Sequence, residues 1–333
     1  MSGIKALRKL QLGVEATPGT PVAATTIWRG TGVLDDQRVI EVVDEDVGSL
    51  PGYDRTEQVK LLAAVSMDAT PFTFEQFCIP CDSGIKTVAG VKDGTGSGYA
   101  YTYPLPTTAL NAIKARTLEG GDDTEAERME YAFCEKIGLS GKGGELLQMQ
   151  SDWKARQVAL NAFTGSLALP AVSGVAVSKG KLYIDLVGGV IGTTNIANVL
   201  LGLNLELVTG WVPFYALDGQ EYFSTHEMSR PRLTGTLTFK HVAAGAARKV
   251  DWRAQTAKQF RLIWQGPALT TPGTAYTYKT LTLDFASKVL GVSKLGEQDG
   301  NDVLEVKVDS RYNSTAALYA SIVVVNELAA LPG

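Results

Sequence analysis

Short segments in which apolar and polar residues alternate recur along the whole chain. The alternation is cleanest in residues 233–239, 279–285 and 303–308. Successive side chains of a β-strand point to opposite faces, so each segment is expected to bury one face and expose the other. The pattern therefore predicts a mainly β protein.

Helix signals occur in two places. The first predicted helix starts at Thr70, has Pro71 in its first position, where a missing N–H costs nothing, and stops before Pro80. The second starts near Asp251, a good N-cap, and ends at about Lys258. Each helix would flank the strands of one half of the chain.

The same order of elements surrounds both predicted helices. An alternating strand precedes each one (residues 61–67 and 233–239), and a Gly-, Pro- and Thr-rich loop with tyrosines follows (94–106 and 267–278). A strand and an acidic turn come next in both halves. We interpret this as a degenerate tandem repeat, with modules at 1–168, including an N-terminal arm, and 169–333. This duplication rests on the order of elements rather than on residue identity, and a single core crossing residue 170 would contradict it.

The composition suits a globular protein of two domains. The chain has 333 residues, 45% hydrophobic and 20% charged, with a net charge of −4, which argues against disorder and against tight binding of nucleic-acid phosphates. Its 35 glycines fit many turns between strands. The three cysteines are too few for a disulfide scaffold, so a reducing compartment such as the bacterial cytoplasm is expected for synthesis.

Neither secretion nor membrane insertion is predicted. The N-terminus lacks the apolar stretch of a signal peptide. Residues 186–205 are uncharged over a membrane-spanning length, but their glycines and asparagines favour a strand, a turn and a second strand.

The sharpest lead toward catalysis is Cys78-Ile79-Pro80-Cys81, which resembles a redox Cys-x-x-Cys motif. That chemistry needs its first cysteine at the start of a helix, whereas the pair is expected here to close one. Small buried cysteines are the preferred interpretation. His226 and His241 are expected at polar strand ends, outside any catalytic arrangement.

Other charged or glycine-rich segments also favour structural interpretations. Residues 139–145 lack the full phosphate-loop spacing and indicate a hairpin turn, and the acidic residues at 44–46 and 122–123 lack calcium-loop spacing. We therefore expect no enzyme activity, and no catalytic, cofactor-binding or metal-binding residues.

A basic cluster with two tryptophans lies in the second half of the chain. It could be a nucleic-acid patch, but a solvated helix face over an aromatic core is the preferred interpretation. Its functional alternative is a contact between subunits, with an acidic turn of a neighbour. The candidate subunit contacts are Arg248, Arg253 and Arg261.

Several segments resemble the tail tube (major tail) proteins of long-tailed bacteriophages. Residues 10–25, LQLGVEATPGTPVAAT, look like the opening motif of that family. Residues 44–48, 117–122, 129–131 and 312–318 are also similar to tail-protein sequences. The resemblance spans nearly the whole chain. It implies that each module is a β-sandwich or closed barrel with one short flanking helix, similar in fold to the type VI secretion tube protein.

The resemblance implies a structural virion protein of the phage tail. Its subunits would assemble into stacked rings around a lumen through which DNA passes without specific binding. Two modules per chain would make a pseudo-hexameric ring from a homotrimer, because a heterologous interface closes when its rotation divides a full turn. Expected partners are further copies and other tail proteins, namely the tape measure, tail tip and terminator.

Hairpins and chain termini bridge successive rings in that family. The corresponding segments here are the N-terminal arm (10–26), residues 42–57 and residues 208–228. The candidate inter-ring contacts are Thr17, Pro18, Gly19, Asp44, Glu45, Asp46 and Tyr53. An ordinary turn is the alternative for residues 17–20, Thr-Pro-Gly-Thr. Carboxylates that faced the lumen would repel the DNA backbone.

Two other functions stay open from the sequence. One is another β-sandwich component of a phage or pyocin-like particle, such as a tail terminator, a tail-tip protein or a decoration protein, which would share the strand pattern without indefinite stacking. The other is a thiol oxidoreductase that uses Cys78 and Cys81.

Overall fold

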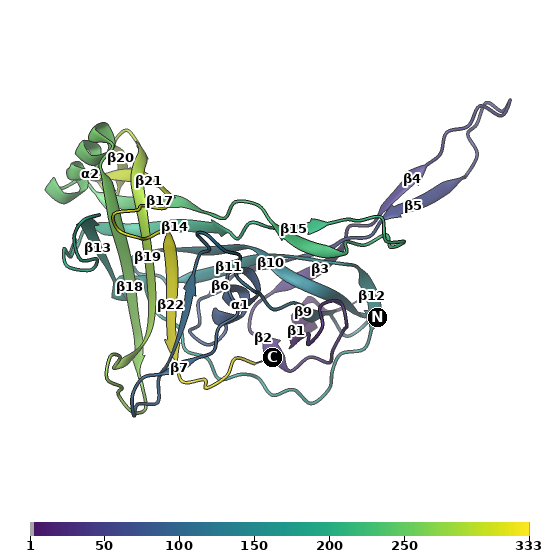
Figure 1. Ribbon diagram of the computed structural model, residues 1–333, viewed down its shortest axis with the longest axis horizontal. Helices are drawn as coiled ribbons and strands as arrows, with labels where there is room; N and C mark the ends of the chain where they lie inside the picture. The colour runs from purple at the N-terminus through teal and green to yellow at the C-terminus, as the bar shows by residue number, and fades with distance from the viewer. Residues whose placement is uncertain (1–2, 333) are drawn as a thin grey trace.

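The computed structural model describes residues 3–332, and it confirms a mainly β fold, with 48% of residues in strands and 8% in helices. Two α-helices lie in this part of the chain, α1 (Cys78–Gly84) and α2 (Ala243–Ala254). Short 3-10 turns occupy Lys5–Leu7 and Val177–Lys179. Figure 1 shows α1 near the middle of the molecule and α2 at one end.

The central feature is an antiparallel sheet of eight strands, which we call the ribbon. Each strand pairs with the next in spatial order, and both halves of the chain contribute four strands. In that order the strands are β3 (Gly32–Asp36), β6 (Ala63–Pro71), β11 (Gln148–Ala155), β10 (Ala126–Lys142), β14 (Leu200–Val208), β17 (Arg232–Lys240), β21 (Asn301–Ser310) and β19 (Tyr278–Val292).

Two long strands, β10 and β19, extend beyond the ribbon. The N-terminal part of each strand belongs to a second sheet, which we call a side sheet. Strand β10 pairs there with β9 (Arg116–Gly121) and β12 (Val158–Asn161), and β9 continues to β1 (Lys9–Val14) and β2 (Thr26–Trp28). Strand β19 pairs with β18 (Ala257–Ala268) and β22 (Ala320–Asn326), and β18 continues to β13 (Gly180–Leu186). Short β20 (Gly296–Gln298) pairs with β21.

The two halves repeat one pairing scheme. Seven strands of the first half have counterparts in the second, and every pairing among the first seven recurs among their counterparts. The corresponding strands are β1 and β13, β3 and β14, β6 and β17, β9 and β18, β10 and β19, β11 and β21, and β12 and β22. Even the bulge in β10, between Cys134 and Lys136, recurs in β19 between Val289 and Gly291. A helix follows β6 in the first half and β17 in the second.

The core nevertheless crosses residue 170, which is the result that we expected to contradict a duplication. That expectation was wrong, because the pairing scheme repeats in two halves that share one core. One cluster of buried side chains runs from Leu10 to Val324. The expected boundary at 168/169 therefore does not separate two cores, because β10 pairs with β14 and β8 (Tyr99–Pro104) adds to the edge of β22. Strand β8, with β7 (Val91–Lys92) beside it, lies where we expected a loop. Its Tyr101 and Tyr103 are fully buried.

The first predicted helix was placed wrongly. Thr70 and Pro71 end strand β6, opposite Met149 and Gln148, and the N–H of Phe72 still donates to the carbonyl of Leu147 at 2.7 Å. Helix α1 begins only at Cys78. Pro80 is its third residue, a position whose N–H has no partner within the helix.

The second predicted helix was placed wrongly in the opposite direction, too far along the chain. It begins at Ala243, and Asp251 lies in its last turn rather than at its N-cap. Gln255 ends it in the left-handed conformation, with φ of 51°. The alanine-rich stretch before Arg248 supplies the helix propensity that the search for a cap overlooked.

The predicted alternating strands at 233–239, 279–285 and 303–308 are confirmed as parts of β17, β19 and β21. Residues 186–205 form the end of β13, a turn and the start of β14, as expected. In residues 3–332 we find no helix long and apolar enough to cross a membrane.

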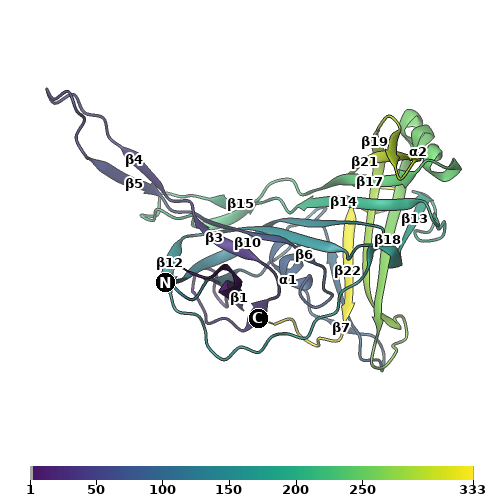
Figure 2. The ribbon, with the colours of Figure 1, turned by 180° about the vertical axis from the view of Figure 1, so that it is seen from behind.

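Two long hairpins extend from the ribbon. The first arm lies between β3 and β6 and contains β4 (Val39–Val42) and β5 (Thr56–Lys60). The second arm lies between β14 and β17 and contains β15 (Trp211–Phe214) and β16 (Thr225–Met228). Figures 1 and 2 show that the first arm projects far from the body, with the second arm near its base.

Candidate assembly surfaces

One face of the ribbon packs on the core, and the other is polar. Cross-strand rows on this polar face join side chains from both halves of the chain. One row passes from Ser66 through Asp152 to Lys136, and another contains Ser140, Asn204, Thr236 and Lys307. Acidic and basic residues are interspersed, so this face has no continuous basic track for binding a phosphate backbone.

The ribbon ends in two strands whose outer edges are unpaired. Among the described residues, β6 is the only strand paired with β3. At the other end, the pairing of β19 with β18 stops at Lys288, so within residues 3–332 Gly291 and Val292 pair with β21 alone. Unpaired strand edges offer rows of backbone donors and acceptors to another chain.

Exposed apolar side chains lie beside these edges. Val33 of β3 is 57% exposed, and Leu295, just after β19, is 44% exposed. Leu290 within β19 is 52% exposed. Solvent exposure of such side chains at an open edge is a feature of surfaces that another chain covers.

A small aromatic cluster attaches the second arm to the body. Phe223 of the arm is fully buried, and its ring lies 5.2 Å from that of Tyr131 and 5.8 Å from that of Phe133. Trp211 donates from Nε1 to the carbonyl of Gly84 at 2.9 Å. The cluster therefore ties the arm to β10 and to α1.

Arg156 adds a polar anchor to this cluster. Its guanidinium lies 4.5 Å from the ring centre of Tyr131 and donates to the carbonyls of Phe223 and Ser224, at 3.0 and 2.8 Å. Such a contact between a cation and an aromatic face stabilises the folded arrangement by on the order of 0.5–2 kcal/mol.

His226 is not the polar surface residue expected from the sequence. Its ring is half-buried against Tyr131, Phe133 and Trp211, and its Nδ1 lies 3.2 Å from the hydroxyl of Tyr131. Burial lowers the pKa of His226, and Glu227 partly opposes this shift. Sequence offers only a weak signal here, namely the adjacent aromatic residues Tyr222 and Phe223 shortly before the histidine.

The two arms touch each other near the base of the first. The N–H of Leu61 donates to the carbonyl of Glu221 at 2.9 Å, and the hydroxyl of Tyr215 donates to the carbonyl of Leu61 at 3.1 Å. The ammonium of Lys60 lies 4.7 Å from the ring centre of Tyr215. The tip of the second arm thus packs on the base of the first.

Four candidate inter-ring contacts, three of them acidic, lie together near the tip of the first arm. Asp44, Asp46 and Tyr53 are exposed, and Glu45 forms an ion pair with Arg55 at 2.6 Å. Apolar side chains are also exposed on this arm, including Val42 and Leu50. The structure thus places this group on a projecting hairpin.

The N-terminal segment does not form a free arm. Strand β1 lies within a side sheet, with Leu10 and Leu12 buried, and Thr17, Pro18 and Gly19 follow in a turn closed by a hydrogen bond from Thr20 N–H to the Thr17 carbonyl at 3.0 Å. Gly19 has φ of 86°, a conformation that favours glycine. The local geometry is therefore that of the ordinary turn, and its role between rings stays a prediction.

The three arginines of the basic cluster differ in environment. Arg248 is buried and forms an ion pair with Asp251 at 2.8 Å, and Arg261 forms a bidentate pair with Asp284, both bonds 2.7 Å. Only Arg253 of the three is exposed and without an ion pair among the described residues. Arg248 and Arg261 therefore stabilise the fold within the chain, and Arg253 is the one free to contact a neighbour.

The cysteine pair opens helix α1 rather than closing it, so that expectation was wrong. Cys78 and Cys81 are fully buried, as is Cys134. Burial raises the pKa of each of the three thiols. A reactive cysteine needs an accessible thiolate, and this environment disfavours one.

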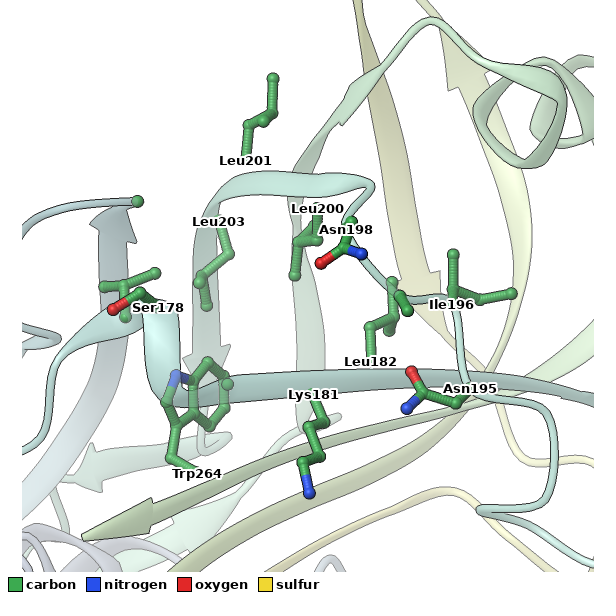
Figure 3. A pocket seen from close by; sticks show the side chains of 14 residues that line it. Ser178, Lys181, Leu182, Asn195, Ile196, Asn198, Leu200, Leu201, Leu203 and Trp264 are labelled. Atoms are coloured by element: carbon green, nitrogen blue, oxygen red, sulfur yellow. The ribbon is translucent and has the colours of Figure 1, made fainter.

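A pocket of about 420 Å³ lies between β13 and β14 (Figure 3). Leu182, Leu203 and Trp264 contribute apolar lining, and Asn195 and Lys181 are polar. Lys181 is the only titratable residue in its described lining, so this pocket lacks a set of acid and base groups.

Metal ligands do not gather in the described part of the chain, where no group of three or more His, Cys, Asp or Glu side chains could hold an ion. A scan against models of protein families and a search of curated protein sequences found no match to this chain.

Proposed function

We propose that this chain is the ring-forming subunit of the tail tube of a long-tailed bacteriophage, a structural virion protein rather than an enzyme. The observation that carries the proposal is the ribbon, an eight-stranded sheet with an unpaired edge at each end. The two edges differ, so pairing one with the other joins copies head to tail. A head-to-tail contact closes into a ring when its rotation divides a full turn.

The polar face of the ribbon supports a role as a conduit. In a closed ring one face of the joined sheet would cover the core and the other would line the lumen. That face has serine, threonine and asparagine among interspersed charges. Such a lining would let DNA pass without the phosphate contacts that hold DNA on basic proteins.

The arms support stacking of the rings. The first arm projects beyond the body and exposes apolar and acidic side chains together, including Leu50, Tyr53 and Asp46. An exposed apolar group of this kind is costly in a free monomer and is useful where a partner covers it. We assign the first arm to contacts with the next ring, and the second arm to its support.

The repeated pairing scheme supports three chains per ring. Each half of the chain would supply one sixth of the ring, and further copies would be the principal partner. Other tail proteins would start and end the tube.

Electron microscopy of the purified chain, with mass measurement in solution, tests this function. Hollow tubes with three chains per ring are the expected result. Six chains per ring would keep the tube and refute the pseudo-hexamer. Single rings that never stack would favour a terminator or another component of the tail, and a persistent monomer at millimolar concentration, also after addition of tail-tip complexes, would overturn the proposal.

A further inference from the structure

We infer that the interface between two copies repeats the junction inside the chain: the outer edge of β3 pairs antiparallel with residues 291–297 of a second copy. This inference rests on the proposed function and specifies its ring contact. It comes from the pairing of β10 with β14, which joins the first half of the chain to the second.

The internal junction is a template because its two strands have counterparts in the other half. Strand β10 corresponds to β19, and the shared bulge aligns Lys136 with Gly291. Strand β14 corresponds to β3. Paired residues can be followed from β3 across β6 and β11 to β10, and from β14 across β17 and β21 to β19, and this aligns Leu205 with Leu34. Those counterparts, β19 and β3, are the two strands that end the ribbon, each with an open edge among the described residues.

Transferring the internal register gives the pairs across the interface. Inside the chain, Leu139 lies opposite Leu205. The corresponding pair is Lys294 opposite Leu34 of the second copy. Continuing in both directions pairs Val292 with Asp36 and Leu295 with Val33.

The directions of the backbone groups support this register independently. The N–H of Gln37 donates to Leu62 at 2.8 Å, toward β6, so the backbone groups of Leu34 and Asp36 point to the open edge. The N–H of Ser293 donates to Glu305 at 2.9 Å, toward β21, so those of Val292 and Lys294 point outward. The transferred register places outward-pointing residues opposite one another.

The side chains also match. Val33 and Leu295, both exposed in the single chain, become direct neighbours across the interface. Lys294 lies diagonal to Asp36 on the same face, within reach of a long side chain. The pair Val33–Leu295 falls between hydrogen-bonded positions, where side chains of antiparallel strands come closest.

Engineered disulfides test the register. The variant Val33→Cys with Leu295→Cys is expected to form covalent closed rings under mild oxidation, because opposed Cβ atoms in such pairs are about 4.5–5.5 Å apart and small backbone shifts bring them into bonding range. A mixture of the two single variants is expected to give disulfide-linked dimers only. Buried native cysteines leave the engineered pair as the accessible thiols.

The control is Val33→Cys with Glu297→Cys, which shifts the pair by two residues, and each variant is first compared with the parent in thermal unfolding. Equal or stronger linking in the control overturns the register. Tubes without linking overturn this interface and leave the proposed function standing. Covalent rings that never stack support the interface and refute the tube, and a monomer without linking refutes both.

Discussion

Removing the Phe223 side chain should release the second arm while the body stays folded. Phe223 is fully buried between Tyr131 and Phe133, and a buried Phe→Ala change costs about 3–5 kcal/mol. The cluster is separate from the main core, so this cost falls on local opening of the arm. Since about 1.4 kcal/mol corresponds to a tenfold change in an equilibrium constant, protection of the arm amides should fall by roughly two to three and a half orders of magnitude.

Hydrogen exchange read by mass spectrometry measures this change. Peptides that cover residues 209–231 should exchange faster in Phe223→Ala, and peptides from β17 and β21 should be unchanged. The control is Phe214→Ala on the same arm, since Phe214 is 53% exposed and its loss should change protection by less than tenfold. Equal loss of protection in the body and the arm would refute a separately anchored arm, as would no loss at all.

Three further changes test the core, the arm and the cysteines. Arg116→Met should lower the free energy of unfolding by about 3–5 kcal/mol at pH 7, because the fully buried carboxylate of Asp82 then loses its buried partner 3.5 Å away. Asp82→Asn added to it should recover part of the loss, and denaturant titration that shows no recovery would contradict an electrostatic cause. Because burial lowers the pKa of His226, attachment of the second arm should be fully present above about pH 6.5 and weaken as the pH falls below it. Protection of the arm amides, corrected for the intrinsic pH dependence of exchange, should lose that dependence in His226→Gln. Cys78→Ser with Cys81→Ser should assemble like the parent in electron micrographs, and a loss of assembly without a loss of stability would favour a thiol function.

The strands were predictable because alternation is a local property. Side chains of a strand point alternately to two faces, so residues 233–239 and 303–308 show in the sequence which face each strand buries. The order of elements around the two helices was visible for the same reason. Neither inference requires knowledge of which strands become neighbours.

The helix positions were not predictable from the local signals used. Pro71 suits the first turn of a helix and also the end of a strand, and the pairing of β6 with β11 selects the strand. Likewise, Asp251 resembles an N-cap, but its carboxylate pairs with Arg248 in the last turn of α2. At Pro71 a tertiary contact outweighs a local preference. At Asp251 two other local preferences prevail, namely the helix propensity of the preceding alanines and the i,i+3 pair with Arg248.

The sequence alone determined the mainly β class and the position of most ribbon strands, because alternation acts over a few positions. The segments that became the arms were expected only from the family resemblance. Only the tertiary structure decided that the two halves share one core and that His226 anchors an arm. It also decided that β3 and β19 end the ribbon with open edges. Strand order depends on contacts between residues far apart in the chain, and alternation, which repeats every two residues, does not record the neighbour of a strand.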